Sequence, residues 1–566
     1  MKKQRESILR SVCRFPAGIL KILTCIISIL ILAVMPFYFQ EGYNHIGSDK
    51  SYFLRTGIVK MGKIVLPVFL LWLICFIVSS IRKRHKGMLR EWRQDLSVTD
   101  WLALLYGVSA VLSYIGSRYK RTALWGTQGW YMGLIPQLAL VVIYFLVSRF
   151  QFQRTAKWLL ILSLPVSAVV FFLGCLNRFD IWPIPMEHSG LPGFISTIGN
   201  INWYCGYAVA IGFVGAGLLW LDRGDRKWHT ILLCSHVILL FSTLITQGSD
   251  SGIFALAIVF LVLFLLSVKD GESQELKRFW LLVLLLAGAE LLIMGLRLLM
   301  PGRMNYSSLL TELLTYSPLP VGLLVMAGGG LWCERFVELR SDGSGDVSSK
   351  DTGIYRRALN VMAKLLCVGI PMAAVVFVLM ITVNTLRPGS LGPLSEREVF
   401  TFDSEWGSKR GATWSLGARC FWEQDLLHKL FGVGPDCMVD FLYSADGSIE
   451  GASAALIDDA RNMFENQRLT NAHCEFLTVL VDMGLLGMFT FGGMLFGAVG
   501  RFLRARTHSC FAVACGLCVL AYVANNLWSF QQSMSLATIG VILGMGEWFT
   551  RAESERKPQP KQQRKQ

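Results

Sequence analysis

Apolar runs of around 20 residues recur along nearly the whole chain, and short polar segments separate most of them. A helix of that length spans the hydrocarbon core of a bilayer, which is roughly 30 Å thick. The 566 residues are 53% hydrophobic and 16% charged, whereas a soluble protein of this size carries about 25% charged residues. The short alternating segments of a membrane β-barrel do not occur in the sequence. We therefore expect an all-α, polytopic membrane protein embedded in a lipid bilayer.

The positions of these runs predict about 14 transmembrane helices. The predicted spans are 16–38, 64–81, 98–116, 130–148, 158–176, 201–221, 229–246, 252–268, 279–299, 317–333, 365–383, 474–500, 508–525 and 534–550. They divide the chain into a bundle of spans 1–11 at 1–383, a large loop at 384–472, spans 12–14 within 473–550 and a basic tail at 551–566. The first run is too long for a cleavable signal peptide, so we expect it to remain as a helix.

The distribution of Lys and Arg predicts the orientation of these spans, because basic residues concentrate in cytoplasmic segments. If the N-terminus is cytoplasmic, the cytoplasmic segments carry about twice as many Lys and Arg as the outer ones. An even number of spans also returns the basic tail to the cytoplasm. We therefore expect both termini in the cytoplasm and the loop at 384–472 outside. The net charge of +15 then reflects topology, and nucleic acid is not an expected partner.

A cluster of basic residues in the outer loop at 117–133 runs against this charge bias. It contains Arg118 and Arg121, close to Trp125 and Trp130. These side chains either anchor the protein at the membrane interface or contact an anionic head group.

Two other outer segments place polar residues at the start of a predicted span. Asn200 and Asn202 open the sixth span, and they either cap the helix or bind sugar hydroxyls or phosphate. Asp250 lies in the hairpin before the eighth span, where an N-cap is the simpler interpretation.

The stretch at 407–442 of the large loop is predicted to contain an amphipathic helix that lies on the outer leaflet or over the bundle. Trp414 is among the aromatic and aliphatic residues that recur there at mostly helical spacing. A turn at 432–435, which contains two glycines and a proline, ends it. Arg410 at the start could grip a phosphate through two parallel hydrogen bonds, and Arg419 is a second cation on the same helix.

His473 lies where the large loop meets the twelfth span. Its imidazole titrates near neutral pH, so it either packs at the interface or serves as a general base. Glu475 follows two residues later and could contact substrate. Gly484 and Gly487 lie on one side of the following helix and permit close contact with another helix.

These motifs, in this order, resemble those of the O-antigen ligase/O-antigen polymerase family of bacterial envelope glycosyltransferases. Members of that family have a multi-spanning bundle and one large extracytoplasmic loop late in the chain. The resemblance covers roughly residues 190–500. The residues that match the family's motifs are Gly199, Asn200, Asn202, Arg410, Trp414, Gly432, Gly434, His473, Leu477, Gly484 and Gly487.

The resemblance implies a membrane glycosyltransferase in the bacterial cytoplasmic (inner) membrane. Such an enzyme moves a glycan from a polyprenyl-pyrophosphate donor to an acceptor hydroxyl at the outer face, as a polymerase or a ligase. The acceptor is a glycan, a lipid or another polymer. His473 would be the general base of an inverting transfer, and Arg410 would stabilise the leaving pyrophosphate. No cofactor is expected, and no metal site, because the 14 cysteines show no metal-ligand spacing on a loop and no Asp-x-Asp motif occurs.

The sequence departs from the family pattern at two places. Many ligases carry an Arg in a hairpin that corresponds to 248–252, and this chain has none there. Arg118, Arg121 or Arg419 would then take its role. Cys474 also follows the histidine, where relatives often have Asn or Ser.

A flippase or transporter of lipid-linked oligosaccharides is the alternative from another class, because about 14 spans suit that architecture. A transporter should carry charged residues within its spans, along the transport pathway. The clearest intramembrane pair is Glu290 and Arg297, seven residues apart in the ninth span. A transporter would not need a long outer loop with a histidine at its end.

Overall fold

A computed structural model of the chain describes residues 2–40, 46–82, 96–184, 190–222, 226–269, 273–306, 308–316, 318–343, 349–443, 451–464 and 467–554. Nearly all of these residues are helical. The sheet consists of two short antiparallel strands, β1 (Phe194–Ile195) and β2 (Gly199–Asn200), with Phe194 opposite Asn200. The predicted all-α class is therefore confirmed. The predicted basic tail lies mostly outside the described residues, which end at Ser554.

Long apolar helices form the bundle, as the recurring runs predict. Their bounds are α1 (Lys2–Ile29, continued by tighter and wider turns to Phe37), α2 (Ile46–Arg82), α4 (Val98–Gly116), α6 (Leu134–Arg149), α7 (Gln153–Arg178), α8 (Ile201–Ile211), α9 (Phe213–Trp220), α10 (Lys227–Thr246), α11 (Asp250–Lys269), α12 (Ser273–Leu299), α13 (Leu309–Tyr316), α14 (Leu319–Gly343), α15 (Ser349–Leu386), α20 (Glu475–Arg504), α21 (Cys510–Asn526) and α22 (Ser533–Ser554).

Each predicted span falls on a helix, and within the described residues 10 helices are long and apolar enough to cross a membrane. The number rises to 11 if the bent pair α13 and α14 forms one span. The remaining three predicted spans fall on α6, α21 and α22, which are not among these helices. The polytopic architecture is thus supported, and the count of 14 stays a prediction.

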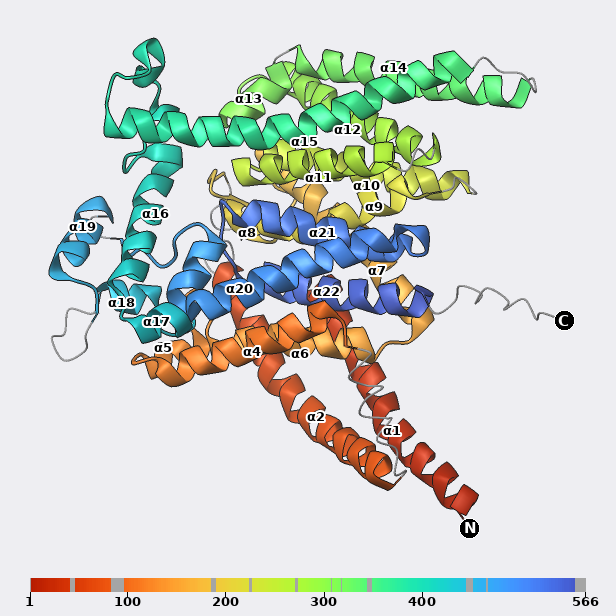
Figure 1. The fold of residues 1–566 in the computed structure, drawn as a ribbon, viewed down its shortest axis with the longest axis vertical. Coiled ribbons are helices and arrows are strands. Elements are labelled where there is room, and N and C mark those ends of the chain that lie inside the picture. The colour runs from red at the N-terminus through yellow and green to blue at the C-terminus, as the bar shows by residue number, and fades with distance from the viewer. Residues whose placement is uncertain are drawn as a thin grey trace.

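Most of these helices lie side by side, with α21 near the middle and α14 and α15 along one edge (Figure 1). Helices α8 and α9 are buried on all sides, whereas the apolar stretch of α15 is exposed throughout. An exposed apolar helix of that length is stable only in contact with lipid. The burial pattern therefore agrees with a bilayer around the bundle.

Residues 387–474 join α15 to α20, and their described parts, which we call the cap, lie at one end of the bundle (Figure 1). Its helix α16 runs across the ends of the bundle helices, whereas the start of α1 and the end of α22 lie on the opposite side. The cap corresponds to the predicted loop at 384–472. Its helices are α16 (Trp406–Glu423), α17 (Leu426–Phe431), α18 (Met438–Tyr443) and α19 (Ala454–Phe464), preceded by single turns at Gly392–Glu396 and Glu398–Phe400.

The cap has its own hydrophobic core, in which Leu416, Phe421, Met438 and Leu456 are buried. Helix α5 (Lys120–Trp125), from the predicted outer loop, adds Ala123 to this core, and α20 adds Val481. The two segments therefore fix the cap to the bundle by burying apolar surface, which is the main favourable term in packing.

The predicted amphipathic helix is interrupted, which corrects the expectation of one continuous helix. Asp425 accepts a hydrogen bond from the His428 backbone N–H at 2.9 Å and starts α17 as a new N-cap. Gly432, with φ of +78°, ends α17 where the sequence predicts a stop. Helix α16 packs against α19 and α20, so of its two predicted positions the one over the bundle agrees with the structure.

Two glycine motifs that the sequence places 50 residues apart contact each other. Helix α20 breaks at Gly484, which has a φ of +67° and a ψ of −170°. A Cβ atom at Gly484 would lie 2.4 Å from the carbonyl of Leu430, and one at Gly432 would lie 2.1 Å from the carbonyl oxygen of Asp482. The break frees the carbonyl of Asp482, which accepts a hydrogen bond from Gly434 N–H at 3.0 Å. This glycine contact fixes the cap to the break in α20.

We expect Gly484→Ala to lower the melting temperature and the yield of folded protein. The left-handed φ costs about 1–2 kcal/mol for a residue with a Cβ atom, and the clash with Leu430 adds to this cost. Thermal unfolding of the detergent-purified protein measures the melting temperature, and size-exclusion chromatography measures the yield of folded protein. Gly500→Ala in the same helix is the control, because its Cβ would meet no atom within 4 Å. Equal melting temperatures for both variants would contradict the glycine contact.

Glu290 and Arg297, the charged residues within the ninth predicted span, do not bind each other. Arg297 Nη2 instead donates hydrogen bonds to both carboxylate oxygens of Glu312, at 2.7 and 2.9 Å. Arg297 is near the end of α12, from which its long side chain reaches the half-exposed start of α13. The carboxylate of Glu290 is buried and has no hydrogen-bond partner within the described ranges.

Candidate functional site

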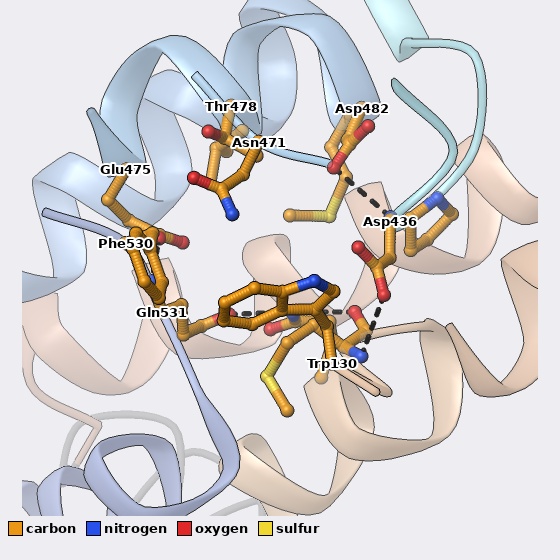
Figure 2. A pocket seen from close by; sticks show the side chains of 13 residues that line it. Trp130, Asp436, Asn471, Glu475, Thr478, Asp482, Phe530 and Gln531 are labelled. Atoms are coloured by element: carbon orange, nitrogen blue, oxygen red, sulfur yellow. Dashed lines mark hydrogen bonds between the residues drawn. The ribbon is translucent and has the colours of Figure 1, made fainter. Parts of the chain in front are cut away.

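A polar cavity lies where the cap meets the bundle (Figure 2). Its volume is about 30 Å³, enough for one or two water molecules. Two aromatic rings, three carboxylates and three amides line it together with smaller apolar side chains. The aromatic, acidic and amide residues are Trp130, Phe530, Asp436, Glu475, Asp482, Asn471, Gln137 and Gln531.

Asp436 attaches the cap to the predicted outer loop at 117–133. One of its carboxylate oxygens accepts hydrogen bonds from the backbone N–H groups of Thr127 at 2.8 Å and Met132 at 3.0 Å. Burial raises the pKa of the Asp436 carboxyl to about 7, although these two hydrogen bonds act in the opposite direction. Asp436 therefore exchanges its proton near neutral pH, at one wall of the cavity.

Asp482 has a structural role that the sequence did not indicate. Its carboxylate accepts hydrogen bonds from the backbone N–H groups of Asp436 at 3.1 Å, Cys437 at 3.2 Å and Met438 at 2.8 Å. These N–H groups precede and begin α18, where no intrahelical partner is available. Asp482 thus caps α18 from the facing helix α20 and fixes the position of Asp436.

Glu475, a predicted substrate-binding residue, is the first residue of α20 and is buried in the cavity wall. Its carboxylate accepts a hydrogen bond from the backbone N–H of Gln531. The side-chain oxygen of Gln531 accepts a hydrogen bond from Gln137 Nε2 at 2.8 Å. The Nε2 group of Gln531 has no partner among the described residues, although it is buried.

His473, the predicted general base, is two residues before Glu475 and has a φ of +48°. Its backbone N–H donates to Asn471 Oδ1 at 3.0 Å, and its ring packs edge-on against Phe530 with centroids 5.0 Å apart. Burial and then the positive charge of Arg410 lower the pKa of His473 to about 4. The imidazole is therefore neutral at pH 7 and has a free lone pair to accept a proton.

Arg410, the predicted phosphate ligand, begins the regular part of α16. It follows three residues in a left-handed conformation, Gly407, Ser408 and Lys409. Its Nε donates to the carbonyl oxygen of Trp528 at 3.2 Å, and its Nη1 donates to the carbonyl oxygen of Gly407 at 2.8 Å. These two bonds orient the guanidinium group and leave three of its five N–H donors for other partners.

Arg410 and His473 come together although 63 positions separate them in the sequence. The positive charge of Arg410 lowers the pKa of the His473 imidazole. Asp250, at the start of α11, is the negative charge that influences the pKa of Arg410. Burial lowers the pKa of Arg410, and the negative charge of Asp250 opposes that shift. The site therefore combines residues from α11, from the two ends of the cap and from the segment that contains Trp528.

Trp414 lies about one helical turn after Arg410 and completes an aromatic cluster. Its ring is 5.6 Å from that of Trp406 and 5.2 Å from that of Trp528. The indole Nε1 of Trp414 is buried and finds no hydrogen-bond partner in the part of the chain that the structure describes. Trp414, a predicted substrate contact, thus lies beside Arg410 with one donor still available.

The other predicted cations do not join this site. Arg419 Nη1 binds Asp459 of α19 at 2.6 Å, so it holds two cap helices together. Arg118 and Arg121 are exposed just before and within α5, and neither lines the polar cavity. The neighbouring Lys120 donates to the last carbonyls of α4 at 2.6 and 2.8 Å, which is a helix C-cap.

The asparagine pair at the start of α8 acts as a cap, the simpler of the two interpretations. Asn200 Oδ1 accepts the backbone N–H of Asn202 at 2.8 Å. A row of rings connects this helix start to the histidine. The ring of Trp203 is 5.8 Å from that of Trp130, which lies 4.8 Å from Phe530.

The sequence reading also missed Arg55, a cation in α2. Its guanidinium lies over the rings of Tyr131 at 5.0 Å and Trp125 at 5.9 Å. In the chain, Trp125 precedes the cavity residue Trp130, and Tyr131 follows it directly. Within the described residues, no carboxylate lies within 4 Å of Arg55. No local signal could have found it, because 70 positions separate it from the aromatic residues it contacts.

Backbone strain is concentrated around this site. Seven described residues other than glycine have a positive φ, and the site contains or borders five of them: Tyr131, Ser408, Lys409, Asp436 and His473. Such conformations cost of order 1–3 kcal/mol each and tend to persist at functional sites. The described residues contain no group of three or more His, Cys, Asp or Glu side chains that could hold a metal ion.

The sequence matches no protein-family model and no curated protein. The site offers a neutral imidazole, an oriented guanidinium and a cavity with aromatic and acidic walls. The imidazole can accept a proton, the guanidinium can bind an anion, and the cavity can hold a polar ligand next to them.

Proposed function

We propose that the protein is a membrane glycosyltransferase that moves a glycan from a polyprenyl-pyrophosphate donor to an acceptor hydroxyl. The reaction takes place at the outer face of the bacterial cytoplasmic membrane, where we also place the cap. Both termini are then cytoplasmic. The protein acts as a polysaccharide polymerase or ligase, as the resemblance implies.

One observation carries this proposal, namely the convergence of Arg410 and His473 on the segment 528–530, where Arg410 binds the carbonyl of Trp528 and the His473 ring packs on Phe530. The two residues come from opposite ends of the cap, and a charged guanidinium acts directly on a neutral imidazole. A histidine that only packs against its neighbours gains nothing from a nearby cation. A cation next to a histidine makes the protonation of its imidazole less favourable, and so keeps it neutral. A transfer site needs both groups, because one partner is an anion and the other loses a proton.

Arg410 acts on the donor. Its three unused N–H donors match the oxygens of a diphosphate, which a guanidinium binds through parallel hydrogen bonds. As the bond between the anomeric carbon and the diphosphate oxygen breaks, the electron pair stays on the diphosphate. The positive charge of Arg410 stabilises that developing charge.

His473 acts on the acceptor. The acceptor oxygen attacks the anomeric carbon from the side opposite the diphosphate, so the configuration inverts. Its hydroxyl proton passes to the lone pair of the imidazole, which the low pKa of His473 keeps available. The imidazolium next to Arg410 then loses that proton readily to water, which restores the base.

Deletion of the gene tests this proposal and separates its two forms. The measurement is the length distribution of surface glycans and of glycans still attached to the polyprenyl carrier. Loss of long chains indicates a polymerase, and long chains that accumulate on the carrier indicate a ligase. A deletion strain with unchanged glycans in both fractions would contradict the proposal.

The pH profile of transfer should reflect the low pKa of His473. In kcat/KM, which reports the free enzyme, we expect activity to be retained as the pH falls from 8 to 5.5, because the base is protonated only at about pH 4. An unperturbed imidazole would lose half of its activity near pH 6.5. Initial rates at subsaturating donor measure this profile. A midpoint near 6.5 would show that His473 is not held neutral by Arg410 and burial.

A further inference from the structure

We infer that the polar cavity beside His473 receives hydroxyl groups of the acceptor and selects a sugar that is uncharged or carries an amino group. Acceptor sugars with a carboxylate or phosphate at this position are excluded. The inference rests on the proposed function, because it assigns the cavity to the acceptor side of the same site.

The aromatic wall fits a sugar ring. Trp130 and Phe530 line the cavity with their rings edge to face at 4.8 Å, and the His473 ring packs on Phe530. Trp130 is half-buried, and Figure 2 shows its ring beside the central space of the cavity. A pyranose has C–H groups on its faces and hydroxyls on its rim, and an aromatic ring packs against those apolar faces.

The size of the cavity fits hydroxyl groups rather than a whole ring. A volume of about 30 Å³ accommodates one or two water-sized groups. The sugar ring therefore stays at the mouth against Trp130, and its hydroxyls replace water inside. Figure 2 shows Asn471, Glu475 and Asp436 around the central space that such hydroxyls would fill.

An unsatisfied donor in the cavity wall points to a ligand. Gln531 is only 6% exposed, and its Nε2 group has no hydrogen-bond partner among the described residues. A buried donor without a partner costs about 1–3 kcal/mol. A ligand hydroxyl supplies the missing acceptor, while its own proton can be donated to the Glu475 carboxylate.

The lack of a cation in the lining sets the selectivity. Asp436, Glu475 and Asp482 line the cavity, and no Lys, Arg or His is among its lining residues in the described structure. A ligand carboxylate or phosphate would be buried beside these acids without a compensating cation, which costs binding energy. Arg410 is instead available to the anionic donor. The site therefore separates an anionic donor from an acceptor that carries no negative charge.

Saturation-transfer NMR on the detergent-purified full-length protein tests the inference with methyl glycosides as probes. We expect saturation of methyl glucoside and methyl glucosaminide, and at least about five-fold weaker saturation of methyl glucuronide. At pH 9, where the Asp436 carboxyl is ionised, Glu475→Gln keeps the size of the side chain and removes one acid from the lining, so the glucuronide signal should rise toward that of the glucoside. Trp130→Ala should abolish all three signals. Trp422→Ala is the control, because this cap tryptophan is 70% exposed and does not line the cavity.

Two results would overturn the inference. One is equal saturation of glucuronide and glucoside in the wild type, and the other is no sugar saturation in a protein that melts cooperatively. The Glu475→Gln result keeps the test decisive if Trp130→Ala does not fold. These binding measurements do not require transfer. A failure of the proposed function would appear separately, as normal transfer by a His473 variant with unchanged sugar binding.

Discussion

Replacing His473 with alanine is expected to reduce glycan transfer by a factor of about 10²–10⁴, the usual contribution of a positioned general base. The acceptor hydroxyl would then have to lose its proton to water. The side chain is half-buried and packs on one ring, so the variant should still fold. The measurement is the length distribution of surface glycans in a deletion strain that expresses the variant at the wild-type level.

His428→Ala provides the matched control for this experiment. His428 is another histidine of the cap, and it binds Asp425 rather than any residue of the site. We expect near-normal glycans with this variant. Normal glycan length with His473→Ala at wild-type expression would contradict the assignment of His473 as the base.

Arg410→Lys is expected to lower transfer by a factor of about 10²–10³, although the positive charge is kept. The guanidinium uses Nε and Nη1 to hold the carbonyls of Trp528 and Gly407, which directs its other donors at a ligand. A lysine ammonium has three donors in total and cannot keep both carbonyls and bind a diphosphate through parallel bonds. The measurement is the rate of carrier release from a lipid-linked glycan by the purified variant.

Arg419→Lys in the same helix is the control for Arg410→Lys. Arg419 pairs with Asp459 near the cap surface, and a lysine can replace it there. We expect less than about a two-fold change in rate for this variant. Wild-type activity of Arg410→Lys would mean that the site needs only a positive charge and not the geometry of the guanidinium group.

Sequence reasoning located the bundle helices because each span must be apolar over its whole length, and this signal is local. It also found both ends of the cap. The glycines at 432 and 484 are visible in the sequence as breaks in helical stretches. That these two breaks contact each other depends on tertiary packing, which no spacing within the sequence reveals.

The residues that the sequence reading missed have their partners far away in the chain. Asp436 binds the backbone at 127 and 132, Gln531 binds Glu475, and Arg55 lies over aromatic rings that are 70 or more positions away. Backbone N–H groups satisfy much of this network, and every non-proline residue has one. The residue types alone therefore gave no indication of these contacts.

The partners of the charged side chains have a common physical cause. Glu290 and Arg297 are seven residues apart in one predicted span, but Arg297 is near a helix end and reaches Glu312 instead. Arg419 was a candidate phosphate ligand, but a nearby carboxylate on α19 neutralises it. A cation near a carboxylate of another helix pairs with it, and sequence spacing does not show which helices are neighbours.

Reconstitution with a defined donor tests the central claim most directly. The purified protein is placed in lipid vesicles with a synthetic polyprenyl-pyrophosphate oligosaccharide and a matching acceptor, and the products are separated by mass. We predict release of the polyprenyl pyrophosphate together with a longer glycan whose new linkage has the inverted anomeric configuration, and neither product with His473→Ala. Movement of the intact donor across the bilayer without any new glycosidic bond would contradict the account and identify a transporter.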